Sequence, residues 1–199
     1  MSRISRDGGI SLDNRWKKLL NSWEGKKYQI PNRRVTERFK YVKKHAKKFE
    51  GLTVLDLGCN AALYALPLVD HVKGYVGVEG ADKYYVQAVD TVEILGRKAR
   101  VFKSRIEDLD FMQLDCDALI VSRVLYYLSD ECLGRIQEQL LPKCKVVLMI
   151  NGTRKKKEKR NSWNFWNCEA GVRFLRGFSC NIEKGEEGAS YRILGERCA

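Results

Sequence analysis

The sequence predicts one α/β domain with a seven-stranded, mostly parallel sheet, one antiparallel edge strand, and additional helices at the N-terminus. Short apolar runs alternate with segments in which apolar residues recur at helical spacing, a pattern typical of strand–helix–strand units. The last two apolar runs are instead joined by a short segment from Gly185 to Gly188, which predicts a hairpin and antiparallel pairing at one edge. A length of 199 residues suits one such domain.

Two helices are expected before the first strand. The first covers residues 11–23, and the second runs from about residue 32 to residue 49. Four lysines lie in the last turns of the second helix, where they complement the helix dipole. We therefore expect residues 1–50 to form a basic helical extension of a domain that spans residues 51–199. The first helix carries its apolar residues on one face: Leu12, Trp16, Leu19, Leu20 and Trp23.

Strands and helices then alternate along the domain. Pro67 lies inside the first predicted helix and should kink or shorten it, because proline lacks an N–H group. Gly96 should end the second helix, and Ser129 can cap the third. Strands are expected at 52–57, 75–79, 100–104, 117–121, 145–150, 178–183 and 189–195, and helices at about 61–69, 82–95, 130–141 and 167–176.

The first strand, turn, helix and second strand form a unit suited to holding a nucleotide. The segment from Val54 to Ala61 is an apolar strand that stops at a turn containing Gly58 and Asn60, and the second strand ends at Glu79. Asparagine adopts positive φ more readily than other non-glycine residues, so it suits a tight turn. A carboxylate at the end of the second strand can accept both hydroxyls of a ribose. The alternative is an ordinary strand–turn in which Glu79 is a solvated helix cap.

The pattern Asp56-x-Gly58-x-Asn60 followed by Glu79 resembles the class I S-adenosylmethionine-dependent methyltransferases. The resemblance covers roughly residues 50–199 and implies a Rossmann-like fold with S-adenosylmethionine as cofactor. This chain departs from the family at Asn60, where a second glycine is usual. The fingerprint Gly-x-Gly-x-x-Gly is absent, which argues against a nicotinamide or flavin enzyme.

The resemblance also implies roles for individual residues, because ligands of such sheets bind at the carboxyl ends of the strands. Asp56 would help to hold the ammonium group of the cofactor, and Gly58 and Asn60 would face its methionine part. Glu79 would bind the ribose. The remaining candidates follow the third and fourth strands: Ile106 would cover the adenine ring, Glu107 would accept from its amino group, and Ser122 would complete the cofactor site.

The segment Ser122-Arg-Val-Leu-Tyr-Tyr127 follows the fourth strand and should lie nearest the transferable methyl group. It resembles the Val-Leu-Tyr-His segment of a methyltransferase subgroup that includes the tRNA wobble-uridine carboxymethyl-transferring enzymes, with Tyr127 in place of the histidine. On this basis Arg123 and Tyr126 are candidate catalytic residues. The alternative is that Tyr126 and Tyr127 are half-buried aromatics that pack the cofactor side of the sheet.

The net charge of +12 is concentrated in two regions. Residues 1–50 contain 15 basic against 5 acidic residues, and residues 151–199 contain 11 against 6, whereas residues 51–150 are mildly acidic. Within a basic loop at 152–163, the run from Arg154 to Arg160 should leave the fifth strand on the cofactor edge. Three aromatic residues that could stack on bases follow this run: Trp163, Phe165 and Trp166. The loop and the N-terminal region therefore predict an RNA partner, although a basic tether beside core tryptophans is the alternative.

Other classes of site are not expected. The chain has two histidines and no Cys/His cluster with metal spacing, so no metal site is predicted. Seven widely spaced cysteines suit reduced thiols. The first residues lack the apolar run of a signal peptide, and no apolar run is long enough to cross a bilayer, so we expect a cytoplasmic protein without membrane partners.

The sequence thus predicts an S-adenosylmethionine-dependent methyltransferase that acts on RNA, with tRNA as the leading candidate. Two alternatives stay open. One is a small-molecule O- or N-methyltransferase whose charge serves solubility or an acidic substrate. The other is a non-catalytic nucleic-acid-binding module of the same fold.

Overall fold

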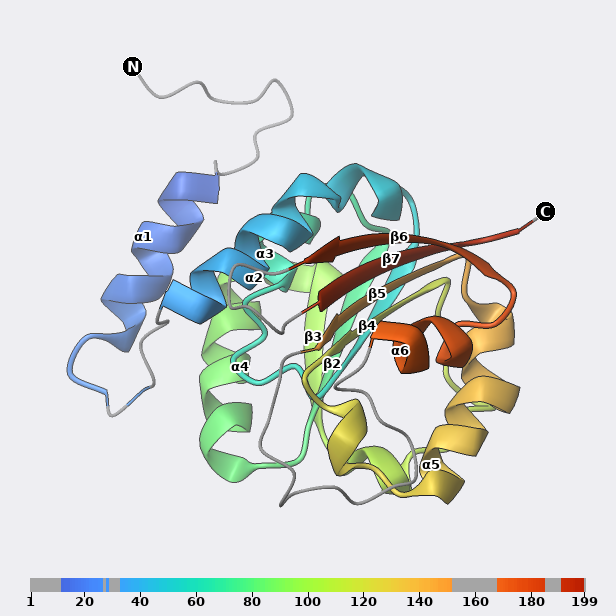
Figure 1. The fold of residues 1–199 in the computed structure, drawn as a ribbon. Helices are drawn as coiled ribbons and strands as arrows, with labels where there is room; N and C mark the ends of the chain where they lie inside the picture. The colour runs from blue at the N-terminus through green and yellow to red at the C-terminus, as the bar shows by residue number, and fades with distance from the viewer. Residues whose placement is uncertain (1–11, 27, 29–32, 152–167, 185–190, 199) are drawn as a thin grey trace.

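The computed structural model describes residues 12–26, 28, 33–151, 168–184 and 191–198. Its centre is a seven-stranded sheet in the order β3-β2-β1-β4-β5-β7-β6 (Figure 1). Strand β7 lies between β5 and β6 and runs antiparallel to both. The predicted fold class is confirmed. The strands are β1 Thr53–Leu57, β2 Gly74–Glu79, β3 Ala99–Lys103, β4 Ala118–Ser122, β5 Val146–Asn151, β6 Phe178–Lys184 and β7 Tyr191–Arg197.

The helices lie close to their predicted positions, with α4 at the predicted bounds and α3 much shorter than expected. Asn60 and Ala62 both have positive φ, so a regular helix begins only at Ala65. Pro67 then falls in the first turn, where a missing N–H leaves no bond unmade. The helices are α1 Leu12–Trp23, α2 Arg33–Lys44, α3 Ala65–Leu68, α4 Asp82–Leu95, α5 Asp130–Arg135 and α6 Cys168–Phe174.

Short irregular turns complete two of the predicted helices. A 3₁₀ turn at Ala46–Phe49 follows α2 after His45, and a π-helical turn at Ile136–Leu140 continues α5. Both turns bury apolar side chains, including Phe49 and Ile136. The predicted amphipathic pattern is therefore correct for these segments, and only the regularity of the helix differs.

Alternate residues of the central strands pack against helices on the two faces of the sheet. Val54, Ile120 and Leu148 pack with side chains of α2, α3 and α4. Leu55 and Val121 lie on the other face, in a cluster that includes residues of α5 and α6. This burial on both faces explains why the strands read as continuous apolar runs rather than as alternating ones.

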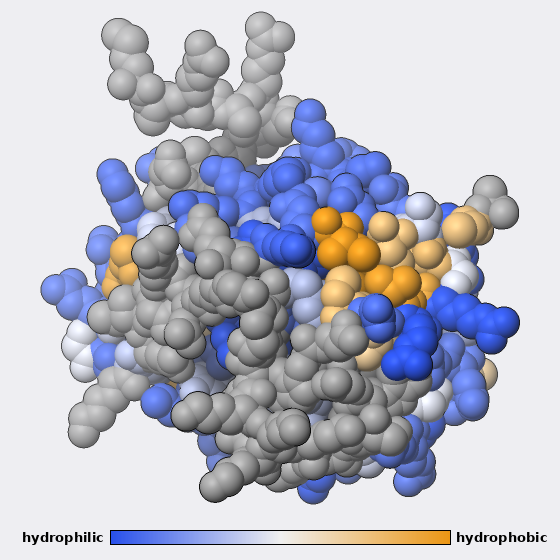
Figure 2. All heavy atoms as spheres, viewed as in Figure 1, coloured by the Kyte–Doolittle hydropathy of each residue, from blue (hydrophilic) through white to orange (hydrophobic). Residues whose placement is uncertain are grey.

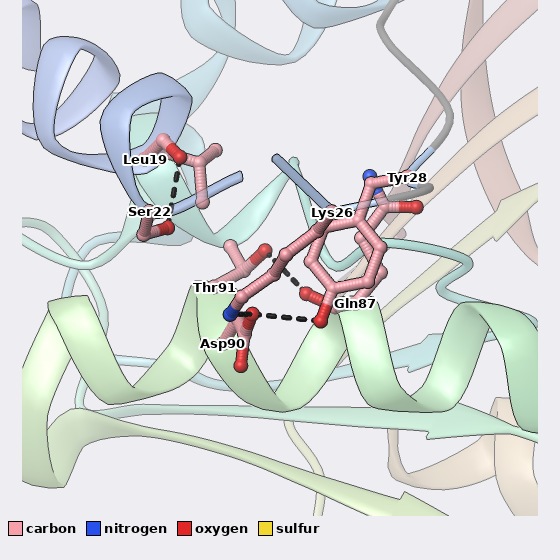
Figure 3. A network of polar contacts seen from close by, with 7 residues as sticks. All are labelled: Leu19, Ser22, Lys26, Tyr28, Gln87, Asp90 and Thr91. Carbon is pink, nitrogen blue, oxygen red and sulfur yellow. Dashed lines mark hydrogen bonds and ion pairs between the residues drawn. The ribbon is translucent and has the colours of Figure 1, made fainter. Parts of the chain in front are cut away.

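The N-terminal helices pack directly on the domain. Arg15 of α1 makes a bidentate ion pair with Asp70, which follows α3, at 2.5 and 2.7 Å. Figure 3 shows a second anchor, in which Lys26 and Tyr28 both donate to the carboxylate of Asp90 on α4. The Tyr28 hydroxyl lies 2.8 Å from that carboxylate. The described part of the predicted extension is therefore held against α3 and α4.

The coloured part of the face in Figure 2 is largely hydrophilic, with an apolar patch to the right of centre over the β6 end of the sheet. Ile182 of β6 is 47% exposed. An edge strand has a neighbour on one side only, so fewer elements are available to cover its apolar side chains. On the same strand, Glu183 pairs with Lys44 of α2 at 2.6 Å.

Candidate functional site

A cavity of about 930 Å³ opens at the carboxyl ends of β1, β2 and β4. Small-molecule sites commonly have volumes of about 300–1,000 Å³, so this cavity is large enough for a nucleoside cofactor with space beside it. Both candidate catalytic residues, Arg123 and Tyr126, line it. So do six of the seven predicted cofactor residues: Gly58, Asn60, Glu79, Ile106, Glu107 and Ser122.

The turn after β1 has the backbone that the sequence predicts. Gly58 has φ of 67° and Asn60 has φ of 53°, which confirms that Asn60 supplies positive φ where the family usually has glycine. The Asn60 side chain also stabilises the turn, because its Oδ1 accepts a hydrogen bond from Ala61 N at 2.9 Å. A Cβ at Gly58 would lie 2.9 Å from Val124 Cγ2, so the close approach of these two segments requires glycine.

Glu79 links this turn to the end of β2. Its Oε2 accepts from Asn60 N at 2.9 Å, and its Oε1 accepts from Ala81 N at 2.8 Å. The residue is only 9% exposed, so it is not the solvated helix cap of the alternative interpretation. A carboxylate has about four acceptor positions, so two remain for hydroxyl donors in the cavity. Two backbone N–H groups thus fix the orientation of a carboxylate that can still accept from a diol.

Asp56 is not brought to the cavity, contrary to the expected role in binding the ammonium group. Strand alternation directs its side chain to the sheet face covered by α2, α3 and α4, where it is completely buried. The Tyr75 hydroxyl donates to Asp56 Oδ2 at 2.5 Å, and Oδ1 has no partner among the described residues. Burial raises the pKa of Asp56 to about 7, although the hydrogen bond from Tyr75 acts in the opposite direction. Asp56 is therefore a buried residue behind the cavity wall.

The segment after β3 forms another part of the wall. Ile106 is 7% exposed and can cover a flat ring, as the sequence predicts. Glu107 Oε2 lies 4.0 Å from Arg105 Nε, so this carboxylate is partly neutralised by its neighbour. The two residues bring an apolar surface and an acceptor to the same side of the cavity.

The end of β4 carries the remaining candidates. Ser122 Oγ lies 3.0 Å from Tyr64 Oη, and Arg123 N donates to Ile150 O at 2.8 Å. Arg123 has φ of 59°, a conformation that costs about 1–3 kcal/mol in a non-glycine residue, and residues held in such conformations cluster at functional sites. Tyr126 is 2% exposed, and its ring centre is 4.6 Å from that of Tyr127. Tyr126 therefore packs as in the alternative interpretation while also contributing to the wall.

Comparisons with known proteins identify the fold. No protein-family profile and no curated protein matches the sequence. Among solved structures, the PH0226 protein from Pyrococcus horikoshii OT3 superimposes with a TM-score of 0.65 at 13% identity, over 89% of this chain and 99% of that one. The small RNA methyltransferase HEN1 gives 0.64 at 15%, over 87% of this chain and only 27% of that one. The N-methyltransferase NodS from Bradyrhizobium japonicum WM9 gives 0.63 at 14%, over 82% and 96%.

The chain has a methyltransferase fold. It spans about a quarter of the HEN1 chain but nearly all of PH0226 and NodS. At these low identities the likeness establishes the architecture alone. The cavity of this methyltransferase fold lies where parallel α/β sheets bind ligands, at the carboxyl ends of the central strands.

The sequence interpretation missed several of the residues that line the cavity of this methyltransferase fold. Tyr84 comes from the first turn of α4, directly after β2, so its position in the motif could have identified it. Tyr64 precedes α3 and could have been found in the same way. Val35 and Arg38 come from α2, well before β1, and no local signal connects them with the cavity.

The structure also bears on the partners considered from the sequence. Among the described residues there is no group of three or more His, Cys, Asp or Glu side chains that could hold a metal ion. No helix in the described ranges is long and apolar enough to cross a membrane. The basic loop at 152–163 with Trp163, Phe165 and Trp166 lies outside the described residues.

Proposed function

We propose that this chain is an S-adenosylmethionine-dependent methyltransferase whose acceptor is RNA. The observation that best supports this cofactor is the position of Glu79. Its carboxylate is nearly buried at the cavity wall and accepts hydrogen bonds from the N–H groups of Asn60 and Ala81. Such a group is oriented before a ligand arrives, so little entropy is lost when it accepts two hydroxyls of a ribose.

The residues present fit the cofactor. Glu79 would bind the ribose, Ile106 would cover the adenine, and Glu107 would accept from its amino group. Gly58 and Asn60 would border the methionine part, because the backbone of their turn approaches the cavity without an intervening side chain at Gly58. Ser122 would lie beside the reacting centre, fixed by its contact with Tyr64.

Bound S-adenosylmethionine supplies an electrophilic methyl group on a sulfonium, and its transfer is an in-line displacement. For such a displacement the protein contributes chiefly by positioning the acceptor. Arg123 and Tyr126, at the end of β4, are the proposed contacts to the acceptor. Their bulky side chains also exclude water from the reacting centre when the cavity is filled.

The RNA acceptor is supported by charge and by one structural relative. The basic regions at 1–50 and 151–199 suit a polyanion, and the HEN1 structure is named as a small RNA methyltransferase. The likeness of the segment from Ser122 to Tyr127 to the wobble-uridine subgroup makes tRNA the first substrate to test. The lysines of α2 offer less positive charge to an RNA than their number suggests, because Lys40 pairs with Glu37 and Lys44 pairs with Glu183.

Calorimetry with S-adenosylhomocysteine tests whether Glu79 binds the cofactor. Replacing Glu79 by Ala removes a charged acceptor, so affinity should fall about ten- to a hundredfold, equivalent to about 1.5–3 kcal/mol. Glu79→Gln keeps the size of the side chain and one carbonyl acceptor, and it should lose less. Wild-type affinity in Glu79→Ala would disprove the assignment of Glu79.

Methyl transfer from labelled cofactor tests the acceptor. We expect label in total tRNA rather than in a metabolite extract, and much less label in tRNA with Glu79→Ala at a cofactor concentration near the wild-type Kd. Label in the metabolite extract alone would instead favour the small-molecule O- or N-methyltransferase.

A further inference from the structure

Strand β3, at one edge of the sheet, carries a run of exposed basic residues. Five of the 11 basic residues between positions 51 and 150 fall within the ten residues from Gly96 to Arg105, which contain no acidic residue. Arg97, Lys98 and Arg100 are exposed, and they make no ion pair within the part of the chain that the structure describes. This edge is therefore a positive region in a part of the sequence that is mildly acidic as a whole.

Two further cations extend this run toward the cavity. Lys103 pairs with Asp82, whereas Arg105 follows β3 by two residues and lines the cavity. The Arg105 Nε lies 4.0 Å from Glu107 Oε2, but the Arg105 side chain is largely exposed, so this contact offsets its charge only in part. Because the carboxyl ends of the parallel strands lie at the cavity, a polyanion on β3 reaches the cavity rim at Arg105.

A solvent-exposed aromatic ring lies among these cations. Phe102 is 47% exposed, and it is the only aromatic residue among the exposed large apolar side chains of the described ranges. Arg100 is two residues before Phe102 and therefore on the same side of the strand, and its guanidinium carbon lies 5.3 Å from the centre of the Phe102 ring. An exposed ring beside a guanidinium group suits a ligand that brings both a flat ring and negative charge.

The topology explains why this side of β3 is exposed. Arg100 pairs with Val76 and Phe102 with Val78, and both valines lie in the core cluster on the face of the sheet that is covered by α5 and α6. Parallel strands are usually joined by a crossover helix. The segment 104–117, all of which the structure describes, contains one short 3₁₀ turn and no α-helix. No crossover helix between β3 and β4 is therefore present to cover Arg100 and Phe102.

The charge of this edge favours single-stranded RNA as its ligand. A second copy of the chain would place the same run of cations against itself, and like charges across an interface are unfavourable. Single-stranded RNA supplies phosphates for the cations and unpaired bases that can stack on Phe102. The bases of an RNA duplex are already stacked on one another, so a duplex supplies phosphates but no free base.

We propose that a surface along β3 binds an unpaired stretch of the RNA acceptor, with one base stacked on Phe102. This surface, the β3 strip, comprises Arg97, Lys98, Arg100, Phe102 and Arg105. The inference rests on the proposed function, because it requires an RNA acceptor. Three strand spacings separate the ends of β3 and β4, roughly 14 Å. The β3 strip therefore holds nucleotides that flank the methylated one, and it gives the acceptor a docking surface outside the cavity.

A salt titration of labelled RNA against the full-length protein tests this inference. The first probe is an oligouridylate, which is single-stranded with little secondary structure, and the second is an RNA duplex. The variants are Arg100→Gln and Phe102→Ala. Arg176→Gln and Ile182→Ala are the matched controls at the opposite edge of the sheet, because Arg176 is an exposed arginine before β6 and Ile182 of β6 is also 47% exposed. Calorimetry with S-adenosylhomocysteine on each variant reports both folding and cofactor binding.

The two variants should weaken RNA binding in different ways. Phe102→Ala should lower oligouridylate affinity about five- to a hundredfold, and it should keep the slope of log affinity against log salt because stacking releases no counterions. The same variant should bind the duplex about as well as the wild type does. Arg100→Gln should flatten the slope for oligouridylate by about 0.7, the value for one phosphate contact on a single strand. Both controls should match the wild type, and affinity for S-adenosylhomocysteine should be unchanged in all four variants.

Three results would overturn the inference while the proposed function stands. Wild-type affinity and slope in both Arg100→Gln and Phe102→Ala would show that RNA docks elsewhere. An equal loss of oligouridylate and duplex affinity in Phe102→Ala would exclude stacking of an unpaired base. A change of oligomeric state in either variant, measured by light scattering with RNA binding intact, would assign this edge to a second copy of the chain. A wild-type protein that binds S-adenosylhomocysteine but neither RNA would instead disprove the proposed acceptor, and the inference with it.

Discussion

The β2 side and the β4 side of the cavity are built in different ways. The β2 side comes from one continuous stretch, in which the Asn60 N–H of the turn donates to the side-chain carboxylate of Glu79. The β4 side combines Arg38 of α2, Tyr64 before α3 and Arg123 after β4. Local geometry thus defines the proposed nucleoside end, whereas the proposed acceptor end depends on how separate elements pack. Substitutions on the β2 side and on the β4 side should therefore affect stability and ligand binding differently.

The largest expected effect lies beneath the β2 side, at Asp56. Its pKa rises from an ordinary 3.8 to about 7 in the folded protein because the carboxyl is buried. Between about pH 4 and 7 the folded protein keeps a proton that the unfolded chain has released, so this residue lowers stability as pH rises through that window. Asp56→Asn should therefore gain about 2–4 kcal/mol at pH 8 and little at pH 4.

Urea unfolding of wild type and Asp56→Asn at both pH values measures this difference. Asp115→Asn is the matched control, because it is the same substitution at an exposed position. The same gain at pH 4 and at pH 8 would mean that Asp56 does not titrate between them. Cofactor affinity should be retained, since Asp56 does not line the cavity.

A smaller effect is expected within the β2 side, at Asn60. A β-branched residue tolerates the observed φ of 53° poorly, so Asn60→Val should cost about 1–3 kcal/mol of stability and weaken cofactor binding. Asn60→Gly should leave binding intact, because glycine adopts this φ without strain even though the contact to Ala61 N is lost. Unfolding and calorimetry on both variants test this pair. Equal behaviour of Val and Gly would show that the turn is not strained.

The smallest effect on stability is expected when the β4 side is loosened. This change should nevertheless separate RNA binding from cofactor binding most clearly. The Trp16 ring of α1 contacts Phe39 of α2 with ring centres 5.4 Å apart, and Phe39 is next to Arg38. Trp16→Ala should cost about 1–2 kcal/mol and loosen α2, which reduces RNA binding but leaves S-adenosylhomocysteine binding unchanged. Leu20→Ala, at a residue of α1 that is 39% exposed, is the control. A parallel loss of both affinities would mean that the two sides are not independent.

The sequence determined the strands, the helix α4 and the turn at Gly58 and Asn60. Each depends on neighbours within a few residues, through apolar periodicity or through the φ that a residue type permits. The same reasoning placed six cofactor candidates at the cavity, because parallel strands end at one edge of a sheet. These features could be predicted because their causes are local.

Only the tertiary structure decided the rest. The hairpin predicted that β6 pairs with β7, but the choice of β7 as the partner of β5 depends on long-range contacts. The alternation of β1 buried Asp56 against Tyr75, which a motif match does not reveal. Arg38 joined the cavity because α2, which precedes β1 in the chain, packs over α3. Residues that meet through packing leave no spacing in the sequence, so the contribution of α2 to this side could not be predicted, whereas Arg123 and Tyr126 could be predicted from their place after β4.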